Sequence, residues 1–378
     1  MRAWDGRLWF KTMTRSAESS TDIKWGLLTA LARAVFLALV ACALLGSSTP
    51  HPAVRAPRFE VSDLGPLQKL ASDLAPGLNS KGDVVVWRQS ESLSFATVLW
   101  TGGRPKTLET PSGYRNSFAY SVNDNGNAAG WANTTLNPVD SFSIVHAVML
   151  SDHGDTDLGT LGGRWSRAYG INNHDVMVGV SELVNKQQRA FQYTKGKMSE
   201  LAPLAGGKTS IAFAINDAGV VVGGAELPQP DSGKMVIHAV RWRDGVPEDL
   251  GALSAKGGSL AYAVNSHNEV VGKADVGEEE TAFLYRSGHM TSLGLRGGRA
   301  FGINDQGQIV GVQRMGEEHP HVTGFLWEAG KLYDLDRCLP AQSPYSIKGA
   351  FRINNAGQIA AIGLLGSELH ALLLTPEK

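Results

Sequence analysis

One phrase recurs seven times after residue 50 of this 378-residue chain, and it constrains the fold more than any other feature. The phrase reads Ile/Val-Asn-polar-x-Gly-x-Val-Val-Gly, and its copies are 39 to 50 residues apart. A period of this length indicates an array built from one small structural unit. The asparagines of the seven copies are Asn79, Asn123, Asn172, Asn216, Asn265, Asn304 and Asn354.

Two further phrases follow each asparagine, His/Thr-Ala-Phe/Val-x-Trp/Tyr-x-x-Gly and then Asp-Leu-Gly-x-Leu. Each unit therefore holds four short strand-like runs, separated by tight turns rich in Asn, Asp and Gly. In the third unit these runs are 166–172, 176–181, 189–193 and 198–204. Four antiparallel strands in about 45 residues are typical of a β-propeller blade, and the 3.6-residue apolar period of a helical repeat is missing.

The order of the phrases predicts how the ring closes. A copy of the Asp-Leu-Gly phrase begins at Asp63, before the first asparagine, and the last unit stops after a third strand at 370–374. We expect the N-terminal strand to complete the last blade, because ring closure removes unpaired strand edges. The sequence thus predicts an all-β fold, a closed seven-bladed propeller over 59–378, preceded by a linker over 51–58.

The first strand of each unit alternates small and bulky residues. Four residues before each asparagine stands an alanine, the next residue is large in six copies, and the one after that is small except at Arg352. Successive side chains of a strand point to opposite faces, so each bulky face is expected to pack against the small face of its neighbour. The large residues are Tyr120, Tyr169, Phe213, Tyr262, Phe301 and Phe351.

Residues 1–50 are predicted to be a targeting segment. The uninterrupted apolar run 34–45 is too short to span a bilayer comfortably, and it resembles the apolar core of a signal peptide with basic residues before it. Either Met1 or Met13 serves as the start. Cys42 ends a Leu-Val-Ala-Cys sequence that matches the bacterial lipidation pattern. A cleaved signal peptide, a lipid anchor at Cys42 and an uncleaved membrane anchor stay open, and each places the domain in the periplasm, outside the cell or at the cell envelope.

The combination of Leu-Gly-Gly, Ser-x-Ala-Tyr-x-Ile-Asn, Gly-Gln-Ile-Val-Gly and His-Ala-Phe-x-Trp resembles the HAF-repeat family of bacterial extracellular repeat proteins. The resemblance covers nearly all of residues 60–374, and the clearest copies lie between Leu161 and Lys331. It implies export and a propeller-like repeat. The family supplies no established catalytic residues to transfer to this sequence.

Composition excludes several functions. Lys and Arg number 35 against 36 Asp and Glu, and no basic stripe is visible, so no nucleic-acid partner is expected. Two cysteines exclude a disulfide scaffold and a cysteine-based zinc site, and Cys338 is predicted to be a buried core thiol.

The turn 123–127 resembles a calcium loop, but most copies offer at most one carboxylate, so we predict turns and no metal or cofactor. His146, His238 and His370 are exchanged for Ala, Arg or Thr in other copies, so each is interpreted as a hydrogen-bonding rim residue or a solvated side chain.

Loop lengths are the best indication of function. The connections between the second and third strands are long and irregular, whereas the turns on the opposite face are short and uniform. We therefore expect a monomeric, exported, non-enzymatic scaffold that binds an unknown protein or glycan and touches a membrane only through its N-terminal segment. The partner is expected on the loops 132–145, 225–237 and 312–322, with Asp140, Arg314, Glu317 and His321 on that face.

An alternative is a cell-envelope enzyme, such as a glycan lyase or hydrolase, whose site lies at the mouth of the propeller channel. An enzyme of this kind needs converging titratable groups. The small positions of the inner strands offer Arg352 as their only charge, which favours the binding scaffold. No residue is assigned a catalytic role.

Overall fold

The computed structural model describes residues 56–67, 75–89, 94–134, 144–229, 232–316 and 321–377. The predicted targeting segment, Cys42, Asp140 and Glu317 lie outside these residues. The described residues belong to one compact unit, Pro57–Lys378, and hold β-strands and one short 3-10 helix. The predicted all-β class is confirmed.

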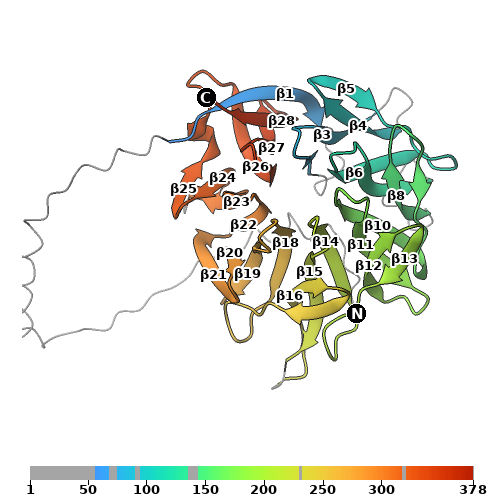
Figure 1. Cartoon of the computed structure of the whole chain (residues 1–378). Coiled ribbons are helices and arrows are strands. Elements are labelled where there is room, and N and C mark those ends of the chain that lie inside the picture. Colours follow the sequence, from blue (N-terminus) through green and yellow to red (C-terminus); the bar gives the residue numbers. More distant parts are fainter. Residues whose placement is uncertain are drawn as a thin grey trace, which may run out of the picture. The chain divides into compact units, whose positions relative to one another are not determined.

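The strands form five four-stranded sheets and one eight-stranded sheet, which consists of two four-stranded units joined by a single parallel pairing of Trp165 with Val145. We number the resulting seven units as blades 1 to 7; Figure 1 shows them around a ring, with the first strand of each blade innermost. Blade 1 holds β2 (Gly77–Leu78), β3 (Val84–Gln89), β4 (Phe95–Thr101) and β5 (Arg104–Thr107); blade 2 holds β6 (Asn116–Val122), β7 (Ala128–Asn133), β8 (Val145–Leu150) and β9 (Thr156–Asp157); blade 3 holds β10 (Gly162–Ile171), β11 (Met177–Leu183), β12 (Gln188–Thr194) and β13 (Lys197–Glu200); blade 4 holds β14 (Ser210–Ile215), β15 (Val221–Pro228), β16 (Met235–Arg243) and β17 (Val246–Asp249); blade 5 holds β18 (Ser259–Val264), β19 (Val270–Val276), β20 (Glu279–Arg286) and β21 (His289–Arg296); blade 6 holds β22 (Arg299–Ile303), β23 (Ile309–Met315), β24 (His321–Glu328) and β25 (Lys331–Asp334); blade 7 holds β26 (Tyr345–Ile353), β27 (Ile359–Leu365), β28 (Glu368–Pro376) and β1 (Phe59–Leu67).

Blade 7 is completed by the N-terminal strand, as the phrase order predicted. β1 pairs antiparallel with β28, from Phe59 opposite Pro376 to Leu67 opposite Leu369 (Figure 1). The register shifts between Asp63 and Gly65, where Gly65 adopts a φ of 100° that L side chains rarely reach. The outermost strand of the last blade is therefore supplied by the other end of the domain.

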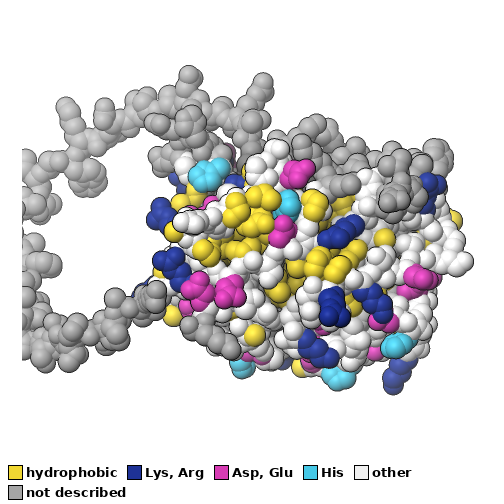
Figure 2. Space-filling model, turned by 90° about the horizontal axis from the view of Figure 1, so that it is seen from above, with side chains coloured by type: hydrophobic (Ala, Val, Ile, Leu, Met, Phe, Trp, Pro, Cys, Tyr) yellow, Lys and Arg dark blue, Asp and Glu magenta, His cyan; other side chains and the backbone are white. Residues whose placement is uncertain are grey.

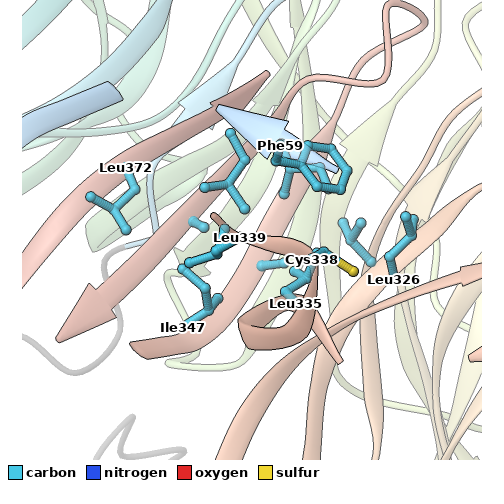
Figure 3. Packing of buried hydrophobic residues seen from close by; sticks show 12 residues of the cluster. Phe59, Leu326, Leu335, Cys338, Leu339, Ile347 and Leu372 are labelled. Atoms are coloured by element: carbon cyan, nitrogen blue, oxygen red, sulfur yellow. The ribbon is translucent and has the colours of Figure 1, made fainter. Parts of the chain in front are cut away.

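The core beside this closing strand joins three segments that are distant in sequence. Figure 3 shows Phe59 of β1 in one cluster with Leu372 of β28 and with Leu335 and Cys338 of the 3-10 helix Leu335–Cys338. Phe59 is 2% exposed and Cys338 is 1% exposed. Burial raises the pKa of the Cys338 thiol to about 11, so the thiolate is suppressed at neutral pH. The prediction of a buried core thiol is confirmed.

The bulky residues of the inner strands pack differently from the prediction. In six blades the register shifts at the aromatic residue, which is left unpaired in a β-bulge. Neighbouring aromatic rings then contact one another around the ring, with centroids 5.0 to 5.4 Å apart. The small residues serve a separate purpose: a Cβ on Gly77 would lie 2.8 Å from the Ser121 backbone of the next blade.

Three of the connections predicted to be long loops are largely strand. β15 and β16 stay paired out to Pro228 and Met235, β19 and β20 out to Val276 and Glu279, and β23 and β24 out to Met315 and His321. The physical reason is clearest in the second of these pairs, where 273–276 alternates polar and apolar residues and Gly277, with a φ of 65°, makes a tight turn. The face carries projecting hairpins, and we call it the hairpin face.

Closure by β1 predicts a large cost for truncating its buried anchor. Phe59→Ala should lower the free energy of unfolding by about 3–5 kcal/mol, because loss of the phenyl group leaves a cavity in the blade 7 core. The measurement is urea denaturation of the domain from residue 57 onward. Val246→Ala, at a residue that is 67% exposed on β17, is the matched control and should change stability little. Equal effects of the two substitutions would contradict closure by β1.

Candidate functional site

The tight-turn face, opposite the hairpin face, is held together by a closed ring of seven asparagines. Each asparagine Nδ2 donates to the backbone carbonyl of the corresponding asparagine in the next blade, at 2.9 to 3.1 Å. The last of these bonds runs from Asn354 of blade 7 to the carbonyl of Asn79 in blade 1. All seven side chains are buried, so these bonds are protected from water.

The same side chains also shape their own turns. The Oδ1 of Asn172 accepts from the backbone N–H groups of His174 and Val176, both at 3.0 Å. This local role is the one expected from sequence. The hydrogen bond from Nδ2 to the next blade was not predicted, although the sequence contains a signal for it. Aspartate also suits such turns, yet it never replaces asparagine at the seven positions, because aspartate lacks the Nδ2–H donor.

The residue after the asparagine adds a second set of links between blades. Ser80 N donates to Asp124 Oδ1 at 3.0 Å, Asn173 N donates to Asp217 Oδ1 at 2.8 Å, and Ser266 N donates to Asp305 Oδ1 at 2.9 Å. These carboxylates are engaged by N–H donors instead of facing a common centre. Among the described residues no three His, Cys, Asp or Glu side chains are grouped so that they could hold a metal ion.

The three histidines pair with aspartates of the outer strand. His146 Nδ1 lies 2.9 Å from Asp157 Oδ2, His238 Nδ1 3.0 Å from Asp249 Oδ1, and His370 Nδ1 2.9 Å from Asp63 Oδ2. At the same place blade 3 has Arg189 with Glu200, at 2.9 Å, and blade 6 has Thr323 with Asp334, at 3.2 Å. Arg or Thr takes the place of the histidine in these two blades and still bonds to the acidic residue of the outer strand, so the expected rim hydrogen bond is confirmed.

These pairs alter the acidity of their carboxyl groups. Burial alone would raise the pKa of Asp249, but the hydrogen bonds from His238 and from the Gly251 backbone outweigh it and hold the pKa below its usual value. The same balance lowers the pKa of Asp63, through His370, and of Asp157, through Tyr114 and His146. Each carboxylate is therefore stabilised in its charged form.

Two of the predicted partner-face residues are described, and they lie together. Arg314 of β23 and His321 of β24 are both exposed near the tip of one hairpin of blade 6. Arg314 also lies beside blade 5, where its charge, after that of Arg296, lowers the pKa of the exposed Glu279. These residues offer charge at a hairpin tip and no buried constellation.

A charged cluster between blades 5 and 6 was not predicted. Glu280 accepts from Lys273 and, at 2.6 Å, from Arg299 Nε. Burial opposes ionisation of Glu280, yet the two cations lower its pKa. Corresponding positions in other blades are mostly apolar, including Phe95, Val145 and Ile237 for Glu280, although blade 3 has Gln188 there and Arg167 in place of Arg299. A carboxylate bound by two cations serves as a structural crosslink, because neither of its oxygens is left to act as a base.

Exposed apolar side chains mark the hairpin face. Seven large hydrophobic residues of the described chain are exposed, and five of them stand at the ends of the connection between the second and third strands of five successive blades. Their exposed fractions run from 37% to 82%. These five are Ile144, Val184, Met235, Val276 and Met315, and we call them the tip residues.

Charge shows no comparable organisation on the side of the domain drawn in Figure 2. Basic and acidic side chains lie interspersed there, with hydrophobic side chains between them, and no basic stripe crosses this side. Within the residues that the structure describes, no helix is long and apolar enough to cross a membrane.

No family model matches the chain, and no curated protein is similar to it. The domain is similar in structure to the β-propeller domain of the trilobed protease from Pyrococcus furiosus, with a TM-score of 0.52 and 13% sequence identity, over 84% of this chain and 95% of that chain. That propeller has an open velcro topology, whereas here β1 pairs with β28.

The acylaminoacyl peptidase of Pyrococcus horikoshii is a more remote structural neighbour. It gives a TM-score of 0.46 at 13% identity, over 80% of this chain and 50% of that chain. At such identities the similarity to the first neighbour shows the β-propeller fold, and activity has to be argued from the site.

The asparagine ring predicts sensitivity to an isosteric change. Asn216→Asp keeps the acceptor of the turn but loses the Nδ2 bonds to Asn265 O and Asn268 Oδ1, and it places a carboxylate against those oxygens. The free energy of unfolding should fall by about 1–3 kcal/mol, measured by urea denaturation. Asn185→Asp, at an exposed turn residue, is the control. A loss no larger than that of the control would show that the ring contributes nothing.

The His–Asp pairs predict a loss of stability in acid. A carboxyl group whose pKa is lowered by folding stabilises the domain above the unfolded pKa of about 4, and this contribution disappears as the pH falls toward the lowered value. Urea midpoints measured from pH 7 to pH 2 should therefore drop below about pH 4. Asp249→Asn should make the drop shallower. The exposed Asp244→Asn should not, and a shallower drop in both would argue against the pair.

Proposed function

We propose that this protein is an exported β-propeller scaffold, without enzymatic activity, that binds a partner through the hairpin face. The observation that carries the proposal is the contrast between the two faces of the ring. On the tight-turn face the asparagines and aspartates are engaged in bonds within and between blades. On the hairpin face five blades present an exposed aliphatic side chain each.

The chemistry of the tip residues favours a protein partner over a glycan. Sugars stack best on flat aromatic rings, whereas aliphatic tips surrounded by polar residues are typical of a surface that docks apolar side chains of another protein. Arg314 and His321 add a charged and a polar group beside Met315, suited to the polar rim of such an interface. Export, the targeting segment over residues 1–50 and membership of the HAF-repeat family remain part of this proposal.

A double substitution on the hairpin face tests the proposal. Val184→Ser with Met235→Ser removes two tip residues, while Val246→Ser with Leu332→Ser removes two equally exposed residues on outer strands. Partners are captured from the envelope fraction of the source cells by the domain from residue 57 onward and compared by quantitative mass spectrometry. We expect the tip variant to lose the captured protein at least tenfold, about 1.4 kcal/mol, and the outer-strand variant to retain it.

Two outcomes would overturn the proposal. Retention of the partner by the tip variant, with loss in the outer-strand variant, would place the interface on the rim of the blades. A captured partner that is released by Asp124→Asn and Asp217→Asn, with unchanged stability, would place it on the tight-turn face.

A further inference from the structure

One charged residue, Arg352, occupies a position on the inner strands, next to the axis of the ring, where the other six blades have a small neutral residue. The small positions two residues before each ring asparagine hold Gly77, Ser121, Gly170, Ala214, Ala263, Gly302 and Arg352. Ser121, Ala214, Ala263 and Arg352 are only half-buried, although they belong to the innermost strand of their blades. Solvent therefore reaches the axis, and we call the space bounded by these seven residues the axial channel.

Arg352 is the one charged residue among the seven that bound this channel, and only Nη1 of its three guanidinium nitrogens has hydrogen bonds within the described chain. Its Nη1 donates to the carbonyl of Phe351 at 2.9 Å and to that of Phe301 in blade 6 at 3.4 Å. Within the described chain no carboxylate pairs with it, and its Nε and Nη2 donate to no protein group. The protein packed around Arg352 removes its guanidinium in part from water and lowers its pKa to about 10, so the charged form is held at a cost that a bound anion would offset.

The repeat itself shows that the fold does not require this charge. The bulge carbonyls exist in five other blades, where glycine, serine or alanine occupies the position of Arg352. A small residue would also let the inner strands approach, as Gly302 does against the Arg352 backbone. An arginine at one of seven equivalent places therefore calls for an explanation other than packing.

We propose that the free Nε–Nη2 edge of Arg352 binds a carboxylate inside the axial channel. This edge presents two parallel N–H donors, the geometry that a planar carboxylate accepts. One positive charge among small neutral residues suits a monoanion better than a phosphate dianion, for which no second cation lies among the axial residues. The site goes beyond the proposed hairpin interface, since Arg352 lies on β26 and none of the tip residues does.

The test uses sodium acetate as the probe, with sodium chloride keeping the ionic strength constant, on the domain from residue 57 onward. Acetate should shift the guanidinium Nε–H resonance of Arg352 saturably in the unaltered protein, observed by nitrogen-15 NMR, and raise the thermal midpoint. Arg352→Met should remove the thermal effect, and Arg352→Lys should weaken acetate binding by roughly tenfold, because an ammonium cannot form the two-pronged contact. Arg243→Met, at an exposed arginine, changes the net charge equally and should leave the response intact.

A peptide arm identifies the source of the carboxylate. Triglycine with a free C-terminus should compete with acetate if the ligand is a peptide end, and amidated triglycine should not. Competition by neither restricts the ligand to small free acids. Absence of a saturable shift, or the same thermal response in Arg352→Met, would overturn the proposal and leave Arg352 as a cap for two carbonyls. The hairpin interface is unaffected by either result, because its variants do not change the channel.

Discussion

The asparagine ring is the constraint on which the rest of the domain depends. A blade alone is a small twisted sheet, and its faces become stable only when neighbouring blades cover them. Seven buried bonds fix each blade against the next at the same height, and they return from Asn354 to Asn79. Because one side chain shapes the turn and clamps the neighbour, local and global structure are specified by the same residue.

The ring also explains why the two faces differ in their freedom to change. A turn that carries an interblade bond tolerates few substitutions, and all seven residues after the asparagines are Asp, Asn or Ser. The hairpins on the opposite face do not have to form an interblade hydrogen bond. Their lengths therefore vary, and they can carry exposed apolar residues such as Val184 and Met235. Variation in loop length and in exposed apolar residues is thereby confined to one face without cost to closure.

Much of the fold could be predicted from the sequence, because the repeat compares the chain with itself. The Asp-Leu-Gly phrase at Asp63 predicted the pairing of β1 with β28. The exchange of His146 with other residue types left a rim hydrogen bond and a solvated side chain open, and the structure shows the hydrogen bond. The bulges could not be predicted, since the register shift at Tyr169 is set by the partner strand and leaves no local trace. The hairpin extensions were hidden for a similar reason: a polar strand that projects from the sheet resembles a loop in composition.

The candidate sites were harder to predict, because their residues are meaningful only as departures from the repeat. Glu280 bonds to Lys273 and Arg299, three positions that are mostly apolar in other blades, yet no phrase contains all three. Arg352 was visible as the one charge at a small position, but only the structure shows which of its donors are occupied. A repeat protein supplies its own reference state, so charge placed where sibling blades have none is the most direct sequence signal of a site.

The seam between the first and last blades shows how the closing strand compensates for a weak blade. In blade 1 the inner strand β2 has two residues, and Pro76 stands where six other blades have an aromatic ring, so the aromatic contacts stop there. β1 bridges this gap from the outside. Phe59 packs in the core shared with Leu326 of blade 6, while Leu64 packs against Val84 and Val86 of blade 1. The strand that completes blade 7 thus contacts the blades on both sides of it, and it spans the interface at which the aromatic contacts stop.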